Sequence, residues 1–305
     1  MEGNILISTI RLSRPKNILI ILATMIGVAV FVHSNEAVII DTVNFSLLVL
    51  STCLIAAAGN MINDYFDITA DEINKPHKLI ISKHLKKSSA LILYWSFNGI
   101  ALITAVYLDW IHHSFLFLIT HGLVIIALWY YSYKLKKTLY TGTLLIALLT
   151  GLIPLLAMTF ILLQNEKNLL SFIHSLPFET PDYIHLIYLF AFFAFMQNLA
   201  REICKDINDV PGDIKIKVNS IPIKYGLQRT KVVVATIVLI QFLFLILDLI
   251  FHDLILVPKA QIAVVTALCI DIVILALMMK DELFVKYSQR LFKLAMVVGL
   301  CALYF

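Results

Sequence analysis

The chain has 305 residues, of which 60% are apolar and 14% are charged, and its mean hydropathy is +0.90. Soluble domains are typically about 45 to 50% apolar and about 25% charged, so this composition excludes a soluble globular enzyme. Disordered chains combine low hydrophobicity with high net charge, whereas the net charge here is only +4. The composition therefore indicates an integral membrane protein, with lipids as its solvent.

A helix that crosses a membrane needs about 20 mainly apolar residues. Runs of this kind lie at residues 17–34, 37–62, 89–108, 114–133, 139–163, 184–203, 231–251, 258–279 and 287–305. We therefore expect an all-α membrane protein in which nine transmembrane helices surround a central cavity, as one domain over residues 1–305. No small-residue cleavage site follows the first run, so we interpret that run as a retained span.

The basic residues predict the orientation of the bundle. If the N-terminus is cytoplasmic, 22 of the 24 Lys and Arg residues fall in inner segments, and only Lys167 and Lys259 fall in outer ones. Because inner loops of membrane proteins are enriched in Lys and Arg, we expect a cytoplasmic N-terminus and an outward C-terminus. Asp248 and Asp271 fall inside predicted spans, where a carboxylate needs a partner.

Two inner segments are acidic as well as basic, which the topology alone does not require. In the first, Asn63, Asp67 and Asp71 are spaced to project from one face of a helix, and Asn60 lies one turn before Asp64. The second carries three more acidic residues in helical spacing, although a proline and a glycine should bend or end that helix before the last of them. These three residues are Asp206, Asp209 and Asp213.

Carboxylates gathered at one mouth of a bundle repel each other unless cations compensate them. Mg²⁺ prefers oxygen ligands, takes only one or two carboxylates, and completes its shell with water and phosphate oxygens. The two acidic segments therefore predict a site for Mg²⁺ and a diphosphate. Basic residues near them could neutralise the remaining phosphate charge. They include Lys134, Lys136, Arg201 and Lys205.

With these motifs the chain resembles the UbiA superfamily of intramembrane prenyltransferases. Asn63, Asp64, Asp67 and Asp71 match the family pattern N-D-x-x-D-x-x-x-D, while Asp209 and Asp213 match D-x-x-x-D. The stretches R-P-K-N from Arg14 and Y-S-Y-K-L-K from Tyr131 are also similar to family segments. The resemblance implies a nine-helix fold and transfer of a polyprenyl group from its diphosphate to a lipophilic acceptor.

The resemblance also assigns expected roles to residues. Expected catalytic residues are Asp64, Asp67, Asp71, Asp206, Asp209 and Asp213, and expected Mg²⁺ ligands are Asn63, Asp67, Asp71, Asp209 and Asp213. Expected substrate-binding residues are Arg14, Asn17, Asn60, Asn63, Lys75, Lys78, Tyr131, Lys134, Lys136, Arg201 and Lys205. Arg14 and Asn17 could instead anchor the first span, and Tyr131 and the two lysines after it could be ordinary interfacial residues.

The acceptor is open at this stage. The stretch from Arg201 to Asp213 is most similar to the branch of digeranylgeranylglyceryl phosphate synthases and their bacterial relatives, which favours a prenylglycerol phosphate held by Lys75, Lys78 or Lys83. The loop N-K-P-H-K-L-I-I departs from that branch, so an aromatic acid or quinone precursor and a terpene cyclase remain alternatives. An ion-coupled transporter and a phosphatidyltransferase are the other rivals. We expect no nucleic acid partner, and the sequence leaves the oligomeric state open.

Overall fold

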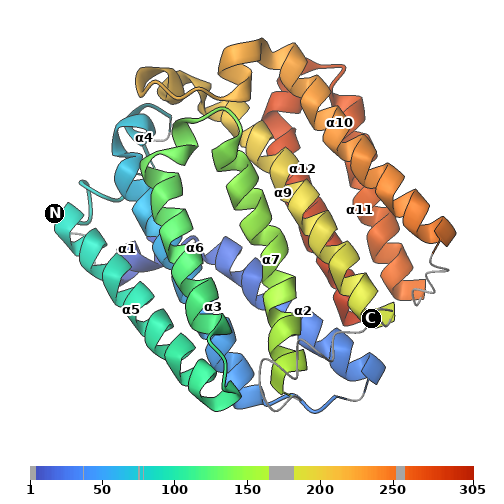
Figure 1. Ribbon diagram of the computed structural model, residues 1–305. Helices are drawn as coiled ribbons and strands as arrows, with labels where there is room; N and C mark the ends of the chain where they lie inside the picture. Colours follow the sequence, from blue (N-terminus) through green and yellow to red (C-terminus); the bar gives the residue numbers. More distant parts are fainter. Residues whose placement is uncertain (1–4, 37, 75, 78, 165–181, 252–257) are drawn as a thin grey trace.

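The computed structural model describes residues 5–36, 38–74, 76–77, 79–164, 182–251 and 258–305. Within these residues the protein is all-helical, and its long helices run side by side (Figure 1). The elements in chain order are α1 (Ile5–Leu12), α2 (Pro15–Glu36), α3 (Thr42–Phe66), α4 (Ile68–Asn74), α5 (Lys87–His112), α6 (Leu116–Tyr133), η1 (Leu135–Lys137), α7 (Thr141–Gln164), α9 (Asp182–Lys215), α10 (Ile221–Phe251), α11 (Pro258–Leu277), α12 (Asp281–Leu300) and η2 (Cys301–Tyr304).

The expectation of membrane-spanning helices is confirmed in part. Among the described residues, seven helices are long and apolar enough to cross a membrane, namely α2, α3, α5, α6, α7, α9 and α10. The apolar part of α11, Gln261–Leu277, is shorter than the other seven. The first half of α12 carries both acidic and basic residues, so this helix falls outside that group although a ninth span is predicted there.

Local chemistry explains where the helices begin and turn. Pro15 occupies the first position of α2, where its missing N–H costs no hydrogen bond. Asp41 caps α3 by accepting a 3.1 Å hydrogen bond from the backbone N of Asn44. Asp109, near the end of α5, accepts from the backbone N of Phe117 and Leu118 at 3.1 and 2.7 Å. This carboxylate satisfies the first turn of α6, so a very short connection is sufficient.

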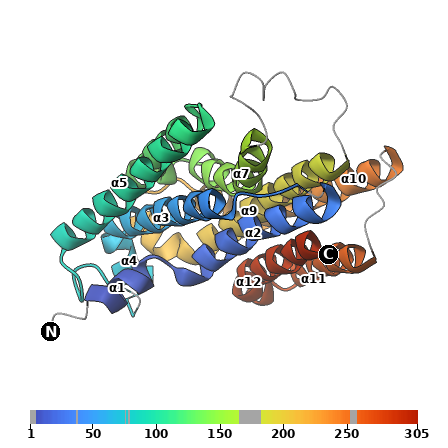
Figure 2. The same cartoon turned by 90° about the horizontal axis from the view of Figure 1, so that it is seen from below.

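The helices pack into a bundle with α2 near its centre. Helix α3 contacts α5 and α6, while α7 packs against both α2 and α9. Helix α9 also contacts α10 and α12, and η2 folds back against α2. Figure 2 shows α2 between α3 and α12, with α5 and α11 towards opposite sides of the bundle. A buried apolar cluster that includes Met25, Leu48 and Phe160 fills the region between α2, α3 and α7.

The two carboxylates expected inside the bundle have partners. Asp271 on α11 is fully buried, and its Oδ2 accepts hydrogen bonds from the side-chain amides of Gln197 and Gln241 at 2.5 and 2.9 Å. Asp248 on α10 pairs with His185 on α9 at 2.7 Å. These contacts tie α9 to α10 and α11, and they meet the requirement that an intramembrane carboxylate be paired.

Candidate active site

A cavity of about 260 Å³ lies between α2, α3, α6, α7, α9 and α12. Much of its wall is aliphatic or aromatic, as with Leu128, Phe190 and Phe193. Charged and amide side chains line it near the start of α2, near the ends of α3 and α6, and on α9 and α12. These polar lining residues include Arg14, Asn17, Asn60, Asn63, Tyr131, Asn198, Arg201, Glu202, Lys205 and Lys293. The cavity therefore suits a molecule with an ionic head and an apolar tail.

The first polar cluster consists of Arg14, Asn63, Asp64, Asp67 and Lys136. Arg14 forms an ion pair with Asp64 at 2.5 Å, and Lys136 forms one with Asp67. The Nδ2 atom of Asn63 donates to Oδ2 of Asp67 at 2.7 Å. Burial opposes the charge of Lys136, but Asp67 and Tyr131 together outweigh it and raise the pKa of Lys136 above its ordinary value. Lys136 therefore stays charged, and it neutralises Asp67.

Backbone turns place this cluster. Asp67 is the C-cap of α3, and its backbone N–H still bonds to the carbonyl of Asn63 at 3.0 Å before α4 begins. The predicted continuous helix is therefore interrupted at Asp67, although the backbone N of Asp71 bonds to the carbonyl of Asp67. Arg14 has a left-handed backbone with φ of 53°, which is uncommon for a residue other than glycine. Such local strain often accompanies functional sites.

The second polar cluster consists of Thr150, Asn198, Arg201, Glu202 and Lys205. Glu202 is only 5% exposed, and it pairs with Arg201 and, at 2.9 Å, with Lys205. Arg201 also donates from Nε to Oδ1 of Asn198 at 2.9 Å, and Asn198 donates to Oγ1 of Thr150 at 2.7 Å. This chain of contacts fixes the orientation of the Arg201 guanidinium on the cavity wall.

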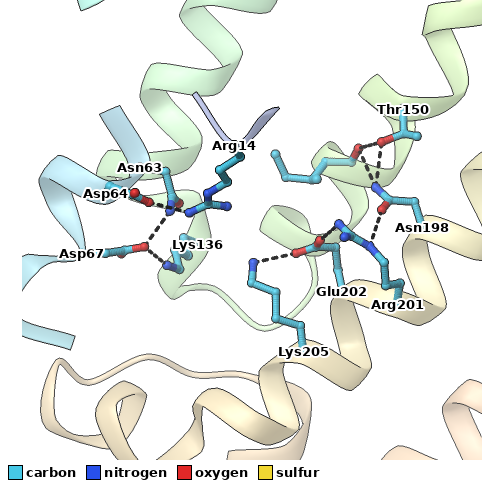
Figure 3. A network of polar contacts seen from close by, with 11 residues as sticks. Arg14, Asn63, Asp64, Asp67, Lys136, Thr150, Asn198, Arg201, Glu202 and Lys205 are labelled. Atoms are coloured by element: carbon cyan, nitrogen blue, oxygen red, sulfur yellow. Dashed lines mark hydrogen bonds and ion pairs between the residues drawn. The ribbon is translucent and has the colours of Figure 1, made fainter. Parts of the chain in front are cut away.

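The two clusters face each other. Figure 3 shows the first cluster on one side and the second on the other, with Lys205 extending between them. The charges also interact across this space, because Lys136 is within electrostatic range of Lys205, and Arg14 is within range of Glu202. The site is thus assembled from segments that lie far apart in the sequence.

The second acidic motif lies on α9. Asp209 and Asp213 are buried, Asp206 is partly buried, and Asp213 is within electrostatic range of Asp67 and Lys136. The sequence predicted that this helix would bend or end before Asp213. The prediction that it ends there is wrong, because α9 continues through Pro211 to Lys215. Asp213 of the second motif and Asp67 of the first therefore lie close enough to influence each other's charge.

Asn74, at the end of α4, bonds to the backbone of α9 on both sides of this proline. The Nδ2 atom of Asn74 donates to the carbonyl of Asp209 at 2.9 Å, while its Oδ1 accepts from the backbone N of Gly212 at 2.8 Å. A Cβ atom at residue 212 would lie only 2.4 Å from Nδ2 of Asn74. Glycine is therefore needed for this close approach, and the contact clamps the segment after the first motif onto the second motif.

We expect Asn74→Ala and Gly212→Ala each to lower the free energy of unfolding by about 1 to 3 kcal/mol, because both leave polar groups of this contact without partners. The double variant should lose little more than either single variant, since both substitutions break the same contact. Thermal unfolding in detergent measures this. Asn208→Ala is the control, because the Asn208 side chain donates to the carbonyl of Cys204 within its own helix. Additive losses would contradict the assigned contact.

The donor set suits a hard divalent cation. The predicted ligands supply only carboxylate and amide oxygens, which match the preference of Mg²⁺. Among the described residues, no three His, Cys, Asp or Glu side chains lie close enough together to hold a metal without other ligands. In proteins Mg²⁺ takes few carboxylates and completes its shell with water and phosphate oxygens, as the predicted ligands would allow.

The remaining predicted residues are placed as follows. Asn17, Asn60 and Tyr131 line the cavity, and Asn60 also donates to the carbonyl of Ser13 at 3.0 Å. Asp71 lies partly buried on α4, whereas Lys134 is exposed and does not line the cavity. Lys75 and Lys78 lie outside the described residues. Lys83 is exposed and donates to the carbonyl of Pro76 at 2.7 Å, away from the cavity wall.

Three residues of this site could not be identified from motif spacing. Glu202 follows Arg201 in a charged segment and belongs to neither motif. Asn198 lies in an apolar run without a motif. Lys293 on α12 lines the cavity and donates from Nζ to Oδ1 of Asn17 at 2.6 Å. A signal for Lys293 existed, because a lysine within a predicted apolar span usually faces the interior or an interface.

The fold is similar to the folds of solved UbiA homologues. A UbiA homologue from Aeropyrum pernix K1 in its apo form has a TM-score of 0.72 at 14% identity, covering 94% of this chain and 96% of the other. A UbiA homologue from Archaeoglobus fulgidus bound to GPP and Mg²⁺ has a TM-score of 0.60 at 15% identity, covering 98% and 100%. At these identities the likeness establishes the fold.

The sequence comparisons establish the family. The digeranylgeranylglyceryl phosphate synthase of Methanosphaera stadtmanae is 31% identical over 229 residues, which are 72% of this chain and 70% of that enzyme. Residues 20–296 match the model of the UbiA prenyltransferase family. The predicted superfamily and prenyltransferase activity are confirmed, and a transporter or a phosphatidyltransferase is set aside. The chain is a multi-pass membrane prenyltransferase that belongs to the UbiA prenyltransferase family.

Proposed function

We propose that this enzyme transfers a polyprenyl group from an allylic prenyl diphosphate to the hydroxyl group of a prenylglycerol phosphate, with Mg²⁺ as cofactor. The bond between the prenyl carbon and the diphosphate oxygen breaks, and a new ether bond forms between that carbon and the acceptor oxygen. The products are the prenyl ether, diphosphate and the proton of the acceptor hydroxyl. No oxidant or reductant is needed.

The observation that carries this proposal is an apolar cavity whose polar lining faces two acidic motifs on α3, α4 and α9. A prenyl diphosphate has the matching division into an apolar tail and an anionic head. The name of the Methanosphaera relative supports a prenylglycerol phosphate acceptor. The Archaeoglobus homologue binds GPP together with Mg²⁺, which supports the predicted cofactor and donor.

The acidic residues would hold the cofactor and the diphosphate. Asn63, Asp67, Asp71, Asp209 and Asp213 are the proposed Mg²⁺ ligands. Asp64 and Asp206 extend the same acidic surface, and Asp64 positions Arg14 through its ion pair. Mg²⁺, when bound, supplies positive charge that stabilises the departing diphosphate, which is electrostatic catalysis at the leaving group.

The cations of both clusters would complete the neutralisation of the diphosphate. Lys136 currently offsets Asp67, and Lys205 extends from α9 between the clusters, so both are placed to contact phosphate oxygens. Tyr131, Phe190 and Phe193 line the cavity, and aromatic faces stabilise a developing allylic cation while excluding water. The prenyl tail would lie along the apolar wall and enter from the lipid.

We also infer the membrane arrangement. Helices α11 and α12 would cross the bilayer with the seven longer apolar helices, giving nine spans. The bias of Lys and Arg places the N-terminus and both acidic motifs on the cytoplasmic side and the C-terminus outside. A diphosphate made in the cytoplasm could then reach the site without crossing the membrane.

The test is turnover by the purified protein in detergent or vesicles. It is incubated with labelled prenyl diphosphates of several lengths and with three acceptors: a monoprenyl ether of glycerol phosphate, an aromatic acid, and no acceptor. We expect product only with the glycerol phosphate ether, and none when EDTA removes Mg²⁺. Turnover with the aromatic acid alone would replace the proposed acceptor, a cyclised product without acceptor would indicate a terpene cyclase, and full activity in EDTA would refute the cofactor.

A further inference from the structure

Lys293 is a cation on the cavity wall that the expected diphosphate site does not use. It lies on α12, on the wall formed by α2, α9 and α12, whereas the first acidic motif lies on α3 and α4. Its Nζ donates to Oδ1 of Asn17 at 2.6 Å, and Asn17 also lines the cavity. A lysine and an amide from two distant helices therefore meet at one point of the cavity wall.

The charges around Lys293 are unbalanced. Arg14, Lys205 and Arg201 also line the cavity, and each forms an ion pair with Asp64 or Glu202. Among the described residues, Lys293 forms no ion pair with a carboxylate, and the charged groups that act on it are Arg201, Lys16 and Arg14. All three are cations, so this part of the cavity lacks a negative charge.

The cavity lining as a whole has the same imbalance. Four of its residues are cations, Arg14, Arg201, Lys205 and Lys293, while Glu202 is the one carboxylate among the described lining residues. The aspartates of both motifs lie beyond this lining. An anion without bound metal would be repelled by those aspartates and attracted to the wall around Lys293.

We propose that Lys293 and Asn17 form the subsite that binds the phosphate group of the acceptor lipid. This inference rests on the proposed function, and it assigns the two anions of the reaction to two different places. The diphosphate, carried with Mg²⁺, lies at the acidic motifs. The acceptor phosphate, a monoester with up to two negative charges, lies at the α2 and α12 wall. Lys293 donates to its oxygens, and the Asn17 amide, released from Lys293, donates from Nδ2.

In this assignment Lys293, and not a lysine of the loop after the first motif, determines which acceptor binds. Lys83 in that loop is exposed and bonds to the carbonyl of Pro76. Lys293, in contrast, opens onto the same cavity as the apolar wall that would hold the prenyl tail of the acceptor. One cavity thus offers both a contact for the phosphate and a surface for the lipid chain.

The test compares Michaelis constants in Lys293→Gln and Lys293→Arg. Loss of a charged hydrogen bond should raise the KM of the prenylglycerol phosphate by about tenfold or more, whereas the KM of the prenyl diphosphate should change less than about twofold. Lys293→Arg should retain most of the acceptor affinity. Lys286→Gln is the matched control, since Lys286 lies on the same helix with its Nζ 5.0 Å from the Tyr287 ring centroid and does not line the cavity.

Two further measurements separate this inference from the proposed function. In EDTA, the prenylglycerol phosphate should still raise the melting temperature of the wild type but not of Lys293→Gln, because this subsite needs no metal. The dephosphorylated ether should show no difference between the two proteins. Equal KM changes for both substrates, an unchanged acceptor KM, or metal-dependent acceptor binding would overturn the subsite. Absence of any prenyl transfer in the wild type would overturn the proposed function, while the binding comparison would still decide the subsite.

Discussion

Asp67→Asn should reduce kcat by about a thousandfold, a loss typical of removing an essential electrostatic contact at a reacting group. Asp67 lies where α3 passes into α4, is 5% exposed, and contacts both Asn63 and Lys136. The variant keeps the size and the planar shape of the side chain but removes the negative charge that is proposed to bind Mg²⁺. Steady-state turnover at saturating Mg²⁺ and prenyl diphosphate measures the effect, and Asp209→Asn should behave alike.

A stability effect has to be separated from this catalytic one. Removing the Asp67 carboxylate leaves the partly buried Lys136 without this partner, and breaking a buried ion pair from one side destabilises a protein. The double variant Asp67→Asn with Lys136→Met removes both charges, so it should unfold closer to the wild-type temperature than the single variant while remaining inactive. Asp281→Asn is a control, because Asp281 pairs with Lys231 outside the cavity. Activity of the double variant within tenfold of wild type would contradict a metal-binding role.

Part of this site could be predicted from the sequence, because the spacing of residues along a helix determines which side chains share a face. Asn63 and Asp67 are four residues apart, and their side chains indeed lie on one face and bond to each other. The helical spacing of the second acidic motif also predicted the helix that the structure shows as α9. The apolar runs predicted the membrane-spanning helices that the structure confirms. These features depend on local geometry, which a helical pattern determines without knowledge of tertiary contacts.

Features that depend on tertiary contacts were not accessible from the sequence. The contact between α4 and α9 around Pro211 is made by Asn74, which is 135 residues from the carbonyl that it binds. The contact of Lys293 with Asn17 joins residues 276 positions apart. The pairing of Arg14 with Asp64, rather than with any other acidic residue, follows from how α1 and α2 meet α3. No spacing rule predicts which distant charges will become neighbours.

Glu202→Gln should lower the free energy of unfolding by about 3 kcal/mol, because it leaves Arg201 and Lys205 without the one carboxylate that both contact. The effect lies at the low end of the range for buried pairs, since the cavity can admit water to the two cations. Thermal and denaturant unfolding in detergent measure the loss. Glu282→Gln is the matched control, because Glu282 is exposed in the first turn of α12.

The same variant should respond more strongly to an anionic lipid. A ligand that binds only the folded state stabilises it according to its concentration and affinity. In Glu202→Gln the wall around Arg201, Lys205 and Lys293 has lost the negative charge of Glu202, so a phosphate group should bind there more tightly than in the wild type. We therefore expect prenylglycerol phosphate to raise the melting temperature of Glu202→Gln more than that of the wild type, and the dephosphorylated ether to raise both equally. A smaller gain in the variant would mean that Glu202 organises the wall for the acceptor, and that its charge does not merely offset the cations beside it.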